Sequence, residues 1–265
     1  MKHLLSCWNV VAGKIREAKH ILLLTDYDGT LTPIVGRPEL ANLPQRAKQS
    51  LQLLAENPHL TLGIISGRTL EDLQEKVGIE GIIYVGNHGL EIEGPGITYV
   101  NPVAGKAGPI LSSLSEELSK ALSGIKGAWM DNKGLTLSLH YRFVDEAQIE
   151  EMSEIFHEAI KASLASGEVQ IIMSKKAYDI KPTVDWDKGE AAAFIAKRIS
   201  KKEPLTVYLG DDVTDYDGFR TVDENGGISI YVGEENTEPV AQYFLYAPEE
   251  VYQFLDMLRE TLSSQ

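Results

Sequence analysis

The sequence predicts an α/β fold, a doubly wound parallel sheet interrupted by a smaller α+β module. Two observations lead to this prediction. Short apolar runs alternate with helical stretches before residue 101 and again after Pro182, and this βαβαβ order is typical of a parallel sheet covered by helices. Between these parts, single helices are instead followed by pairs of strands. We therefore expect a core made of residues 1–104 and 182–265, with a cap domain of residues 105–181 inserted into it.

The first part of the core is predicted to hold three strands separated by two helices. Each strand is a short aliphatic run bounded by turn signals, as in buried parallel strands. The first helix has Pro44 in its opening turn, a favourable place because the missing N–H is not needed there. In chain order, the predicted elements are strand 21–24, helix 43–57, strand 60–65, helix 69–77 and strand 81–85.

The inserted part repeats one pattern, a helix followed by two strands. Its predicted elements are helix 110–122, strands 126–130 and 135–141, helix 146–164, and strands 169–173 and 177–181. The core then resumes with helix 189–199, strand 206–209, a helix near Phe219, strand 228–232 and helix 249–262. Because such an insertion brings a second surface to the carboxyl edge of the sheet, we expect it to act as a closing cap.

The composition limits the class of protein. The chain has 265 residues, 43% of them hydrophobic, enough for one large domain or two modest ones. A formal net charge of −14 disfavours nucleic-acid binding, which usually needs a basic face. No apolar run approaches the roughly 18 residues of a membrane span, the N-terminus lacks a secretory-signal pattern, and Cys7, as the single cysteine, excludes an internal disulfide. We expect a cytoplasmic monomer that binds neither membrane nor nucleic acid.

The most informative segment is Asp26-Tyr27-Asp28-Gly29-Thr30, directly after the first strand. Side chains two apart on a strand point the same way, so Asp26 and Asp28 leave its carboxyl end together, where open α/β sheets bind ligands. Two close carboxylates repel unless a cation or a shared proton separates them. Gly29 allows a tight turn whose N–H groups can face an anion. The pattern indicates a Mg²⁺-dependent phosphoryl site, and the alternative is an acidic β-turn.

Three later segments supply candidate partners. Ser66 ends the second strand with a hydroxyl for a phosphate oxygen, and Arg68 offers a guanidinium to an anion, although an ordinary strand-to-helix turn is the alternative. Lys188 lies near a helix N-terminus, where the dipole disfavours it unless an anion compensates; the alternative is a solvated lysine. Three carboxylates after strand 206–209 indicate a hard cation, or else an acidic helix cap: Asp211, Asp212 and Asp215.

The order DxDGT, Ser, Lys and GDDxxD resembles the motifs of the haloacid-dehalogenase-like (HAD-like) phosphatases. The resemblance implies that Asp26 attacks phosphorus and forms an aspartyl-phosphate, while Asp28 protonates the leaving alcohol and then takes a proton from water. The phosphate ligands that it implies are Gly29, Thr30, Ser66 and Lys188. The Mg²⁺ ligands that it implies are Asp26, the backbone carbonyl of Asp28 and Asp211, with Asp215 and Asp212 in support.

Further segments resemble the trehalose-6-phosphate phosphatases over nearly the whole chain. That pattern has NHGxE, then ExKG followed by HYR, then Glu-hydrophobic-basic-Pro before the lysine. The matching residues here are Asn87-His88-Gly89-Leu90-Glu91, Asp131-Asn132-Lys133-Gly134, His140-Tyr141-Arg142 and Asp179-Ile180-Lys181-Pro182. The resemblance implies a sugar-phosphate substrate, a role in trehalose biosynthesis and a functional link to a trehalose-phosphate synthase. The sugar contacts that it implies are Arg68, Asn87, His88, Asp131, Lys133, His140, Arg142 and Asp179.

This chain departs from the family pattern at three places. Asp131 and Asp179 stand where the family usually has glutamate, which is one methylene longer, and Tyr216-Asp217 replaces a usual Glu-Asp pair. Recognition of sugar hydroxyls is sensitive to that reach. The sequence therefore leaves open a related substrate, namely sucrose 6-phosphate, glucosylglycerol phosphate or mannosylglycerate phosphate.

Other functions and roles also stay open at this point. A sugar phosphomutase shares the DxDGT start but needs a bisphosphorylated activator, and a non-catalytic sugar-phosphate-binding module has no need of clustered acids. His140 and Arg142 have the alternative of pairing with neighbouring acids. Asn87 and His88 have the alternative of stabilising their own loop.

Overall fold

The computed structural model describes residues 1–199, 204–234 and 240–263. The chain divides into two compact units. The core unit consists of Met1–Tyr99 and Trp186–Gln265, and the inserted unit consists of Val100–Asp185. The predicted cap limits, 105–181, fall within the inserted unit. Each unit has its own sheet and its own hydrophobic core.

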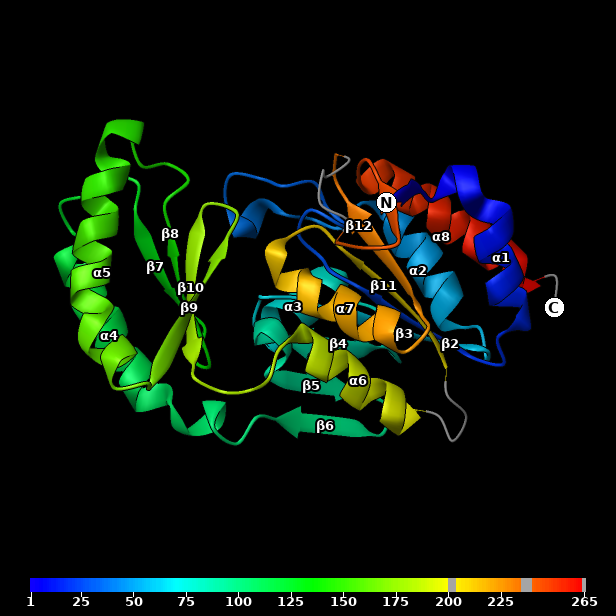
Figure 1. The fold of residues 1–265 in the computed structure, drawn as a ribbon, viewed down its shortest axis with the longest axis horizontal. Helices are drawn as coiled ribbons and strands as arrows, with labels where there is room; N and C mark the ends of the chain where they lie inside the picture. Colours follow the sequence, from blue (N-terminus) through cyan, green and yellow to red (C-terminus); the bar gives the residue numbers. More distant parts are fainter. Residues whose placement is uncertain (200–203, 235–239, 264–265) are drawn as a thin grey trace. The chain divides into compact units, whose positions relative to one another are not determined.

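The core unit is built on a nine-stranded sheet with the order β1-β13-β12-β11-β2-β3-β4-β5-β6 (Figure 1). Every pair from β1 across to β4 is parallel, and β5 joins β4 antiparallel. This confirms the predicted parallel α/β core. The strands are β1 (Lys2–His3), β2 (Ile21–Thr25), β3 (Leu60–Ile65), β4 (Ile83–Gly86), β5 (Glu91–Gly94), β6 (Ile97–Val100), β11 (Leu205–Gly210), β12 (Ile228–Val232) and β13 (Tyr243–Leu245).

Helices cover both faces of this sheet, as the doubly wound prediction requires (Figure 1). They are α1 (Trp8–Glu17), α2 (Gln45–Ala55), α3 (Leu70–Val77), α6 (Lys188–Ile199), α7 (Tyr216–Glu224) and α8 (Pro248–Ser263). Along β2, Ile21 and Leu23 pack in the cluster with α1, α2, α3 and α8, whereas Leu22 and Leu24 pack in the cluster with α6 and α7. Burial on both faces explains why this strand is a continuous apolar run.

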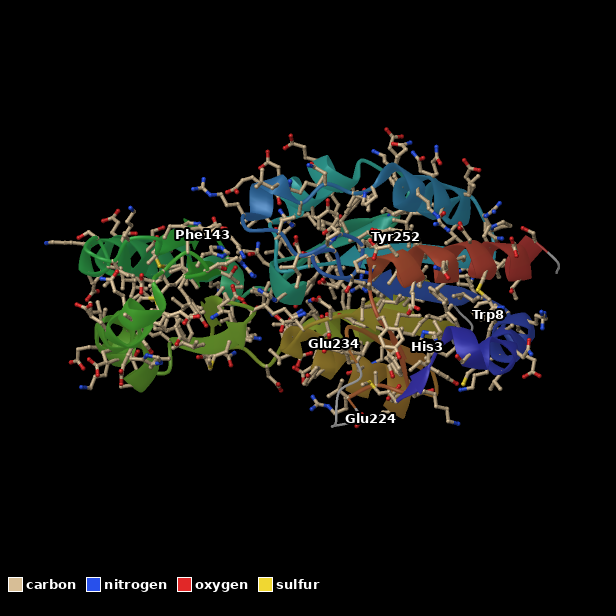
Figure 2. All side chains as sticks on the ribbon, turned by 90° about the horizontal axis from the view of Figure 1, so that it is seen from above. His3, Trp8, Phe143, Glu224, Glu234 and Tyr252 are labelled. Carbon is tan, nitrogen blue, oxygen red and sulfur yellow. The ribbon has the colours of Figure 1, made fainter. Side chains whose placement is uncertain are left out.

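One contact ties the C-terminal helix to the loop after the DxDGT segment. Tyr252 of α8, labelled in Figure 2, is 6% exposed and donates a hydrogen bond to the Leu31 carbonyl at 2.9 Å. The C-terminal helix therefore supports the loop next to the two candidate catalytic aspartates, Asp26 and Asp28.

The inserted unit is a four-stranded antiparallel sheet with the order β7-β8-β10-β9 and two helices. Its elements are α4 (Gly108–Ala121), β7 (Trp129–Asn132), β8 (Leu137–His140), α5 (Ile149–Ala165), β9 (Val169–Ser174) and β10 (Ala177–Pro182). The chain order repeats helix, strand, strand, as predicted. One hydrophobic core joins the sheet to both helices.

Alternate residues decide which side of the inserted sheet meets these helices. Leu137 and Leu139 of β8, with Tyr178 and Ile180 of β10, pack in the core with α4 and α5. The residues between them point to the opposite side, here called the helix-free face. Along this face, the register places Ser138 between two aspartates, Asp131 of β7 and Asp179 of β10. The polar residues of this face therefore follow from the alternation of side chains along each strand.

The structure differs from the sequence prediction mainly in the strands. The strands β1, β5, β6 and β13 were not predicted, because each has only two to four residues and so gives little apolar pattern. The strand predicted at 126–130 begins three residues too early and ends two residues too early, because β7 covers Trp129–Asn132. Gly127 instead adopts φ +94°, and a Cβ there would clash with the Phe143 carbonyl.

No helix within residues 1–199, 204–234 and 240–263 is long and apolar enough to span a membrane.

Candidate active site

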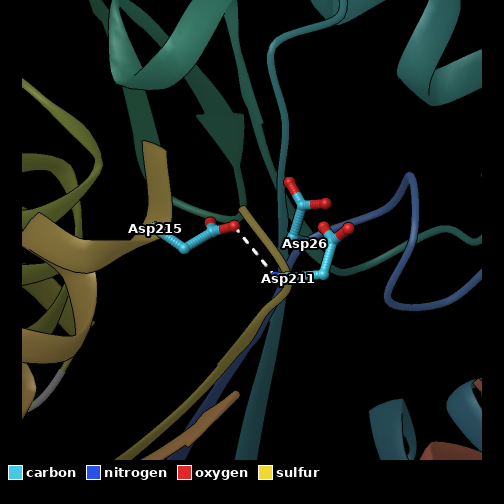
Figure 3. A group of neighbouring side chains, drawn as sticks. All are labelled: Asp26, Asp211 and Asp215. Atoms are coloured by element: carbon cyan, nitrogen blue, oxygen red, sulfur yellow. Dashed lines mark hydrogen bonds between the residues drawn. The ribbon is translucent and has the colours of Figure 1, made fainter. Parts of the chain in front are cut away.

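Three aspartates meet at the carboxyl edge of the core sheet (Figure 3). Asp26 follows β2, while Asp211 and Asp215 follow β11, which pairs directly with β2. Each offers one carboxylate oxygen, and these oxygens all lie within 4.8 Å of one another. All three side chains are buried. Acidic residues that are far apart in the sequence therefore form one cluster, here called the core acid cluster.

Lys188 brings a positive charge to the core acid cluster. It is the first residue of α6, is 2% exposed, and donates from Nζ to Asp26 Oδ1 and Asp215 Oδ1, each at 2.7 Å. Burial alone would lower the pKa of this ammonium, but the charges of Asp215 and Asp26 raise it above its ordinary value. These carboxylates compensate a lysine at a place that the helix dipole disfavours.

The donor set of the cluster fits a hard divalent cation. Burial raises the pKa of Asp26 well above its usual range; Lys188 opposes this shift, and the like charges of Asp215 and Asp211 add to it. The cluster thus holds three carboxylates and one ammonium, and a bound cation would favour the ionised forms of the carboxylates. Carboxylate and carbonyl oxygens are the ligands that suit Mg²⁺, Ca²⁺ or Mn²⁺. Asp26 and Asp211 are the residues that would hold such an ion.

Both carboxylate oxygens of Asp215 accept hydrogen bonds from the protein. Oδ1 accepts from Lys188 and from the buried hydroxyl of Tyr208 (3.0 Å), while Oδ2 accepts from the backbone N–H groups of Asp211 (3.1 Å) and Asp212 (3.2 Å). Asp212 caps the short helix η6 (Val213–Asp215) through its own side chain. Asp215 therefore fixes the turn that presents Asp211. Tyr208 was not predicted, because nothing in the sequence separates it from its neighbours in a buried strand.

The turns beside the cluster hold the residues predicted to bind phosphate. Gly29 adopts φ +88°, and a Cβ there would clash with the Asp211 carboxylate, so the close approach of this turn requires glycine. Thr30 is buried, and within the described part of the chain its Oγ1 has no hydrogen-bond partner, which leaves a hydroxyl for a ligand. Ser66 is buried at the end of β3, where its Oγ accepts from the Arg68 N–H (3.3 Å).

Arg68 and Asp28 form a bidentate ion pair. Arg68 Nε donates to Asp28 Oδ2 at 2.6 Å, and Nη2 donates to Asp28 Oδ1 at 2.7 Å. Arg68 Nη1 also donates to Asp72 Oδ2 of α3 at 2.5 Å. Burial would lower the pKa of this guanidinium, but the bonds to Asp28 and then to Asp72 raise it further above its already high value. Asp28 thus lies in a different environment from Asp26, although both come from one motif.

The Asn87–Gly89 turn after β4 supports the Ser66–Arg68 turn. Asn87 N–H donates to the Arg68 carbonyl (2.7 Å), and His88 N–H donates to the Ser66 carbonyl (2.9 Å). Asn87 Nδ2 donates to Glu91 Oε1 (2.7 Å), which also accepts from the N–H of Leu70 at the start of α3. Both Asn87 and His88 have positive φ, 48° and 57°. For Asn87, these contacts agree with the alternative that it stabilises its loop.

The inserted unit holds a second group of acids on its helix-free face. Asp179 is 5% exposed and accepts from the Ser138 hydroxyl and, at 2.7 Å, from the Ser174 hydroxyl. Asp131 Oδ2 lies 3.9 Å from His140 Nε2, and this imidazole is the main reason that the pKa of Asp131 is lowered. We call Asp131 and Asp179 with these partners the inserted acid group. The two serines were not predicted, because their contact with Asp179 depends on strand register.

Three more residues lie close in sequence to Asp131 and His140, and their exposure differs. Trp129 stacks on the His140 ring with centroids 4.6 Å apart. Lys133 lies in the β7–β8 turn, half-buried. Arg142 is exposed just beyond β8, where its Nη2 donates to the Lys175 carbonyl (3.0 Å). Trp129 was not predicted either, although it lies two residues before Asp131 on the same strand and therefore shares its face.

The fold and the motif order define the class to which this protein belongs, the HAD-like hydrolases of phosphoric monoesters. Residues of the first and last of those motifs form the core acid cluster. A haloacid-dehalogenase-like hydrolase from Bacteroides thetaiotaomicron has a similar fold, with a TM-score of 0.63 at 16% identity over 91% of this chain and 100% of that one.

The chain belongs to the trehalose-phosphatase family, whose model matches residues 24–249. The probable trehalose-phosphate phosphatase 3 of Oryza sativa subsp. japonica is 30% identical over 270 residues, covering 95% of this chain and 72% of that protein. The C-terminal domain of the trehalose-6-phosphate phosphatase of C. albicans has a TM-score of 0.84 at 24% identity, covering 95% of this chain and 96% of that one. The predicted family is thereby confirmed.

Proposed function

We propose that this protein hydrolyses trehalose 6-phosphate to trehalose and phosphate, with Mg²⁺ and through an aspartyl-phosphate. The observation that carries the proposal is Asp26 at the end of β2, bonded to Lys188 at 2.7 Å and clustered with Asp211 and Asp215. Membership of the trehalose-phosphatase family supports the substrate. We further propose that the protein acts as a cytoplasmic monomer on the product of a trehalose-phosphate synthase.

The reaction begins at Asp26. Its carboxylate attacks phosphorus, the ester P–O bond breaks, and the proton of the Asp28 carboxyl passes to the leaving sugar oxygen. Asp28 then takes a proton from water, which attacks phosphorus and releases phosphate and free Asp26. Lys188, the Ser66 and Thr30 hydroxyls and the N–H groups around Gly29 bind the phosphate oxygens, where negative charge accumulates.

Mg²⁺ is proposed to be held by Asp26, the backbone carbonyl of Asp28 and Asp211, and it supplies charge neutralisation at the phosphoryl group. Asp215 supports this site by fixing the Asp211 turn and Lys188 through the bonds described above. Asp212 supports it by capping the helix that follows.

The sugar is proposed to bind to the polar residues of the helix-free face. Asp131 and Asp179 are half-buried and buried, and carboxylates accept hydroxyl hydrogen bonds. The other sugar contacts that we propose are Lys133, His140 and Arg142, with Asn87 and His88 from the core unit.

One observation favours a second candidate, a phosphatase of a related glycosyl phosphate. Asp179 is one methylene shorter than the usual glutamate, and hydroxyl groups of Ser138 and Ser174 already bond to its two oxygens. This arrangement changes which substrate hydroxyls can donate a hydrogen bond to the Asp179 carboxylate. Sucrose 6-phosphate, glucosylglycerol phosphate and mannosylglycerate phosphate are the candidates.

A panel of esters separates the two candidates. Phosphate release is measured for trehalose 6-phosphate, the three related esters and glucose 6-phosphate, each with Mg²⁺ and with a chelator. We expect trehalose 6-phosphate to give the highest kcat/KM by at least about tenfold, a difference of about 1.4 kcal/mol, and chelation to abolish release. Equal slow rates on all esters would contradict the proposed substrate, and Mg²⁺-independent release would contradict the mechanism.

A further inference from the structure

The Arg68 guanidinium is a buried cation whose hydrogen bonds go to other residues of the protein. Its side chain is 7% exposed, whereas the side chains of Asp28 and Asp72 are each 40% exposed. All of these residues lie in the core unit. An ion in such a place must be paired and hydrogen-bonded, because desolvation is otherwise too costly.

The two bonds to Asp28 use the planar fork of the guanidinium. Nε and Nη2 donate in parallel to the two oxygens of one carboxylate, at 2.6 and 2.7 Å. A bidentate pair of this kind fixes the plane and the direction of the carboxylate as well as its distance. A lysine in the same place would supply a point charge without that orientation.

The other contacts of Arg68 hold the guanidinium itself in place. Nη1 donates to Asp72 Oδ2 (2.5 Å), and Nη2 also donates to the Pro38 carbonyl (2.7 Å). The guanidinium carbon lies 5.2 Å from the ring centroid of Tyr27, the residue between the two motif aspartates. That ring is fully buried, and its hydroxyl donates to the Ala41 carbonyl. The fork is thus held by α3, by the Pro38–Leu40 turn and by the DxDGT segment.

We infer that Arg68 is a positioning residue that holds the Asp28 carboxyl group in one orientation for proton transfer, and that Asp72 holds Arg68. This role differs from the substrate contact expected for Arg68 from the sequence. A substrate anion at the guanidinium would have to displace Asp28, Asp72 or the Pro38 carbonyl from bonds of 2.5 to 2.7 Å. The inference rests on the proposed role of Asp28 as general acid.

The two roles predict different dependence on the leaving group. A sugar alkoxide must be protonated as it leaves, whereas p-nitrophenolate leaves without a proton. A variant that disturbs only Asp28 therefore slows the first step for the sugar ester and spares it for p-nitrophenyl phosphate. A variant that loses a phosphate contact slows both esters, because both carry the same phosphoryl group.

The test is the first-turnover rate of leaving-group release, with enzyme in excess and saturating Mg²⁺. Arg68→Met is compared with wild type on p-nitrophenyl phosphate and on whichever sugar phosphate wild type hydrolyses best. We expect a loss of about 10²-fold or more on the sugar ester, the usual contribution of general acid catalysis, and less than about 10-fold on the aryl ester. Arg68→Lys should give the same pattern, since it keeps the charge without the fork.

Asp72→Asn is the second variant, with Glu71→Gln as its matched control. Glu71 is an exposed acid in the same first turn of α3, so the control removes the same charge from the same helix end. We expect Asp72→Asn to lower the sugar-ester rate by about 10-fold, the effect of one displaced hydrogen bond to a charged group, and Glu71→Gln to leave both rates unchanged. The double variant Asp28→Asn/Arg68→Met should be no slower than Asp28→Asn alone.

Several results would overturn the inference. Equal losses on both esters, with more enzyme needed to reach half of the maximal first-turnover rate, would assign Arg68 to the substrate phosphate. Equal losses with a lowered Tm would assign it a purely structural role. A faster first step in Arg68→Met would mean that the pair restrains Asp28 unproductively. Because each variant is compared with wild type on an ester that wild type hydrolyses, a failure of the proposed substrate appears separately in the wild-type rates.

Discussion

The two groups of acids in this protein have partners of opposite character. In the core acid cluster, the carboxylates of Asp26 and Asp215 are bonded to an ammonium, and Asp28 nearby is bonded to a guanidinium. In the inserted acid group, Asp179 is bonded to two hydroxyls and Asp131 lies against an imidazole. Positively charged partners suit a phosphoryl group, while neutral hydroxyls suit an uncharged sugar.

The contrast extends to the cost of ionisation. Burial raises the pKa of Asp26, and an added positive charge would favour the ionised form of this carboxyl group. The His140 imidazole, 3.9 Å away, instead lowers the pKa of Asp131 below its ordinary value. A bound cation would therefore change the ionisation of the core acid cluster more than that of the inserted acid group.

The largest effect is expected in the core acid cluster. Asp26→Asn removes the proposed nucleophile and should lower kcat by about 10⁴-fold or more, the range seen when a catalytic nucleophile or its partner is lost. It also removes a proposed cation ligand, so saturating Mg²⁺ should no longer raise Tm. In wild type, Mg²⁺ at about 100 times its Kd should stabilise the fold by about 2.7 kcal/mol.

Steady-state kinetics and thermal melts with and without Mg²⁺ measure both effects. Asp256→Asn is the control, because Asp256 of α8 bonds to residues of α2 and belongs to neither acid group. A variant Asp26→Asn that kept its activity, or a Tm increase with Mg²⁺ equal to that of wild type, would break the proposed distinction between the groups.

An intermediate effect is expected in the inserted acid group. Asp179→Asn keeps the shape of the side chain and loses its charge, so it should raise KM for the sugar phosphate by about 10-fold or more, as for a hydrogen bond to a charged group. The kcat on p-nitrophenyl phosphate, which lacks the sugar, should stay within about twofold of wild type. Glu158→Gln, an exposed position on α5 of the same unit, is the matched control.

The result for the aryl ester decides how sharply the two groups differ. If Asp179→Asn lowered kcat equally on both esters, the inserted acid group would act on the phosphoryl chemistry and the division of roles would fail.

The smallest effect concerns Asp256, which combines both kinds of partner. It accepts from Arg46 Nη2 (2.9 Å) and from the Ser50 hydroxyl (2.7 Å). Burial alone would raise the pKa of Asp256, but these bonds lower it below its ordinary value. The resulting stabilisation is present above an ordinary aspartate pKa of about 4 and is lost as pH falls through the lowered pKa.

Urea unfolding of wild type and Asp256→Asn at pH 7 and pH 3 tests this pH-dependent stabilisation by Asp256. At pH 7 the variant should be less stable by under about 1 kcal/mol, since the pair is partly exposed. The difference should shrink at pH 3. A difference of the same size at both pH values would show that Asp256 contributes by packing and not by charge.

The convergence of the core acids followed from the sequence, because parallel strands end at one edge. An aliphatic run before Asp26 and another before Asp211 were sufficient to place both residues there. The partners of Arg68 were not predictable in this way. A guanidinium after a strand suits a substrate anion and a protein carboxylate equally, and only the packing of α3 and the Pro38–Leu40 turn decides between them.

Strand register sets the same limit in the inserted unit. Ser138 bonds to Asp179 because β8 and β10 pair with those two residues opposite each other. A shift of one residue would turn the serine into the hydrophobic core, and local sequence does not determine such a pairing. Trp129 and Asp131, by contrast, share a face through the two-residue period alone.

The pairing of β2 with β11 has a consequence for biosynthesis. Ile21 to Thr25 find their partners in Leu205 to Leu209, so this contact must wait until the ribosome has extended the chain beyond residue 209. The strands of the inserted unit all precede β11 in the chain, so their pairing with one another does not wait for it. A prematurely terminated product that ends before Asp211 would carry Asp26 with no acidic counterpart from β11, and such fragments would be inert toward phosphate esters.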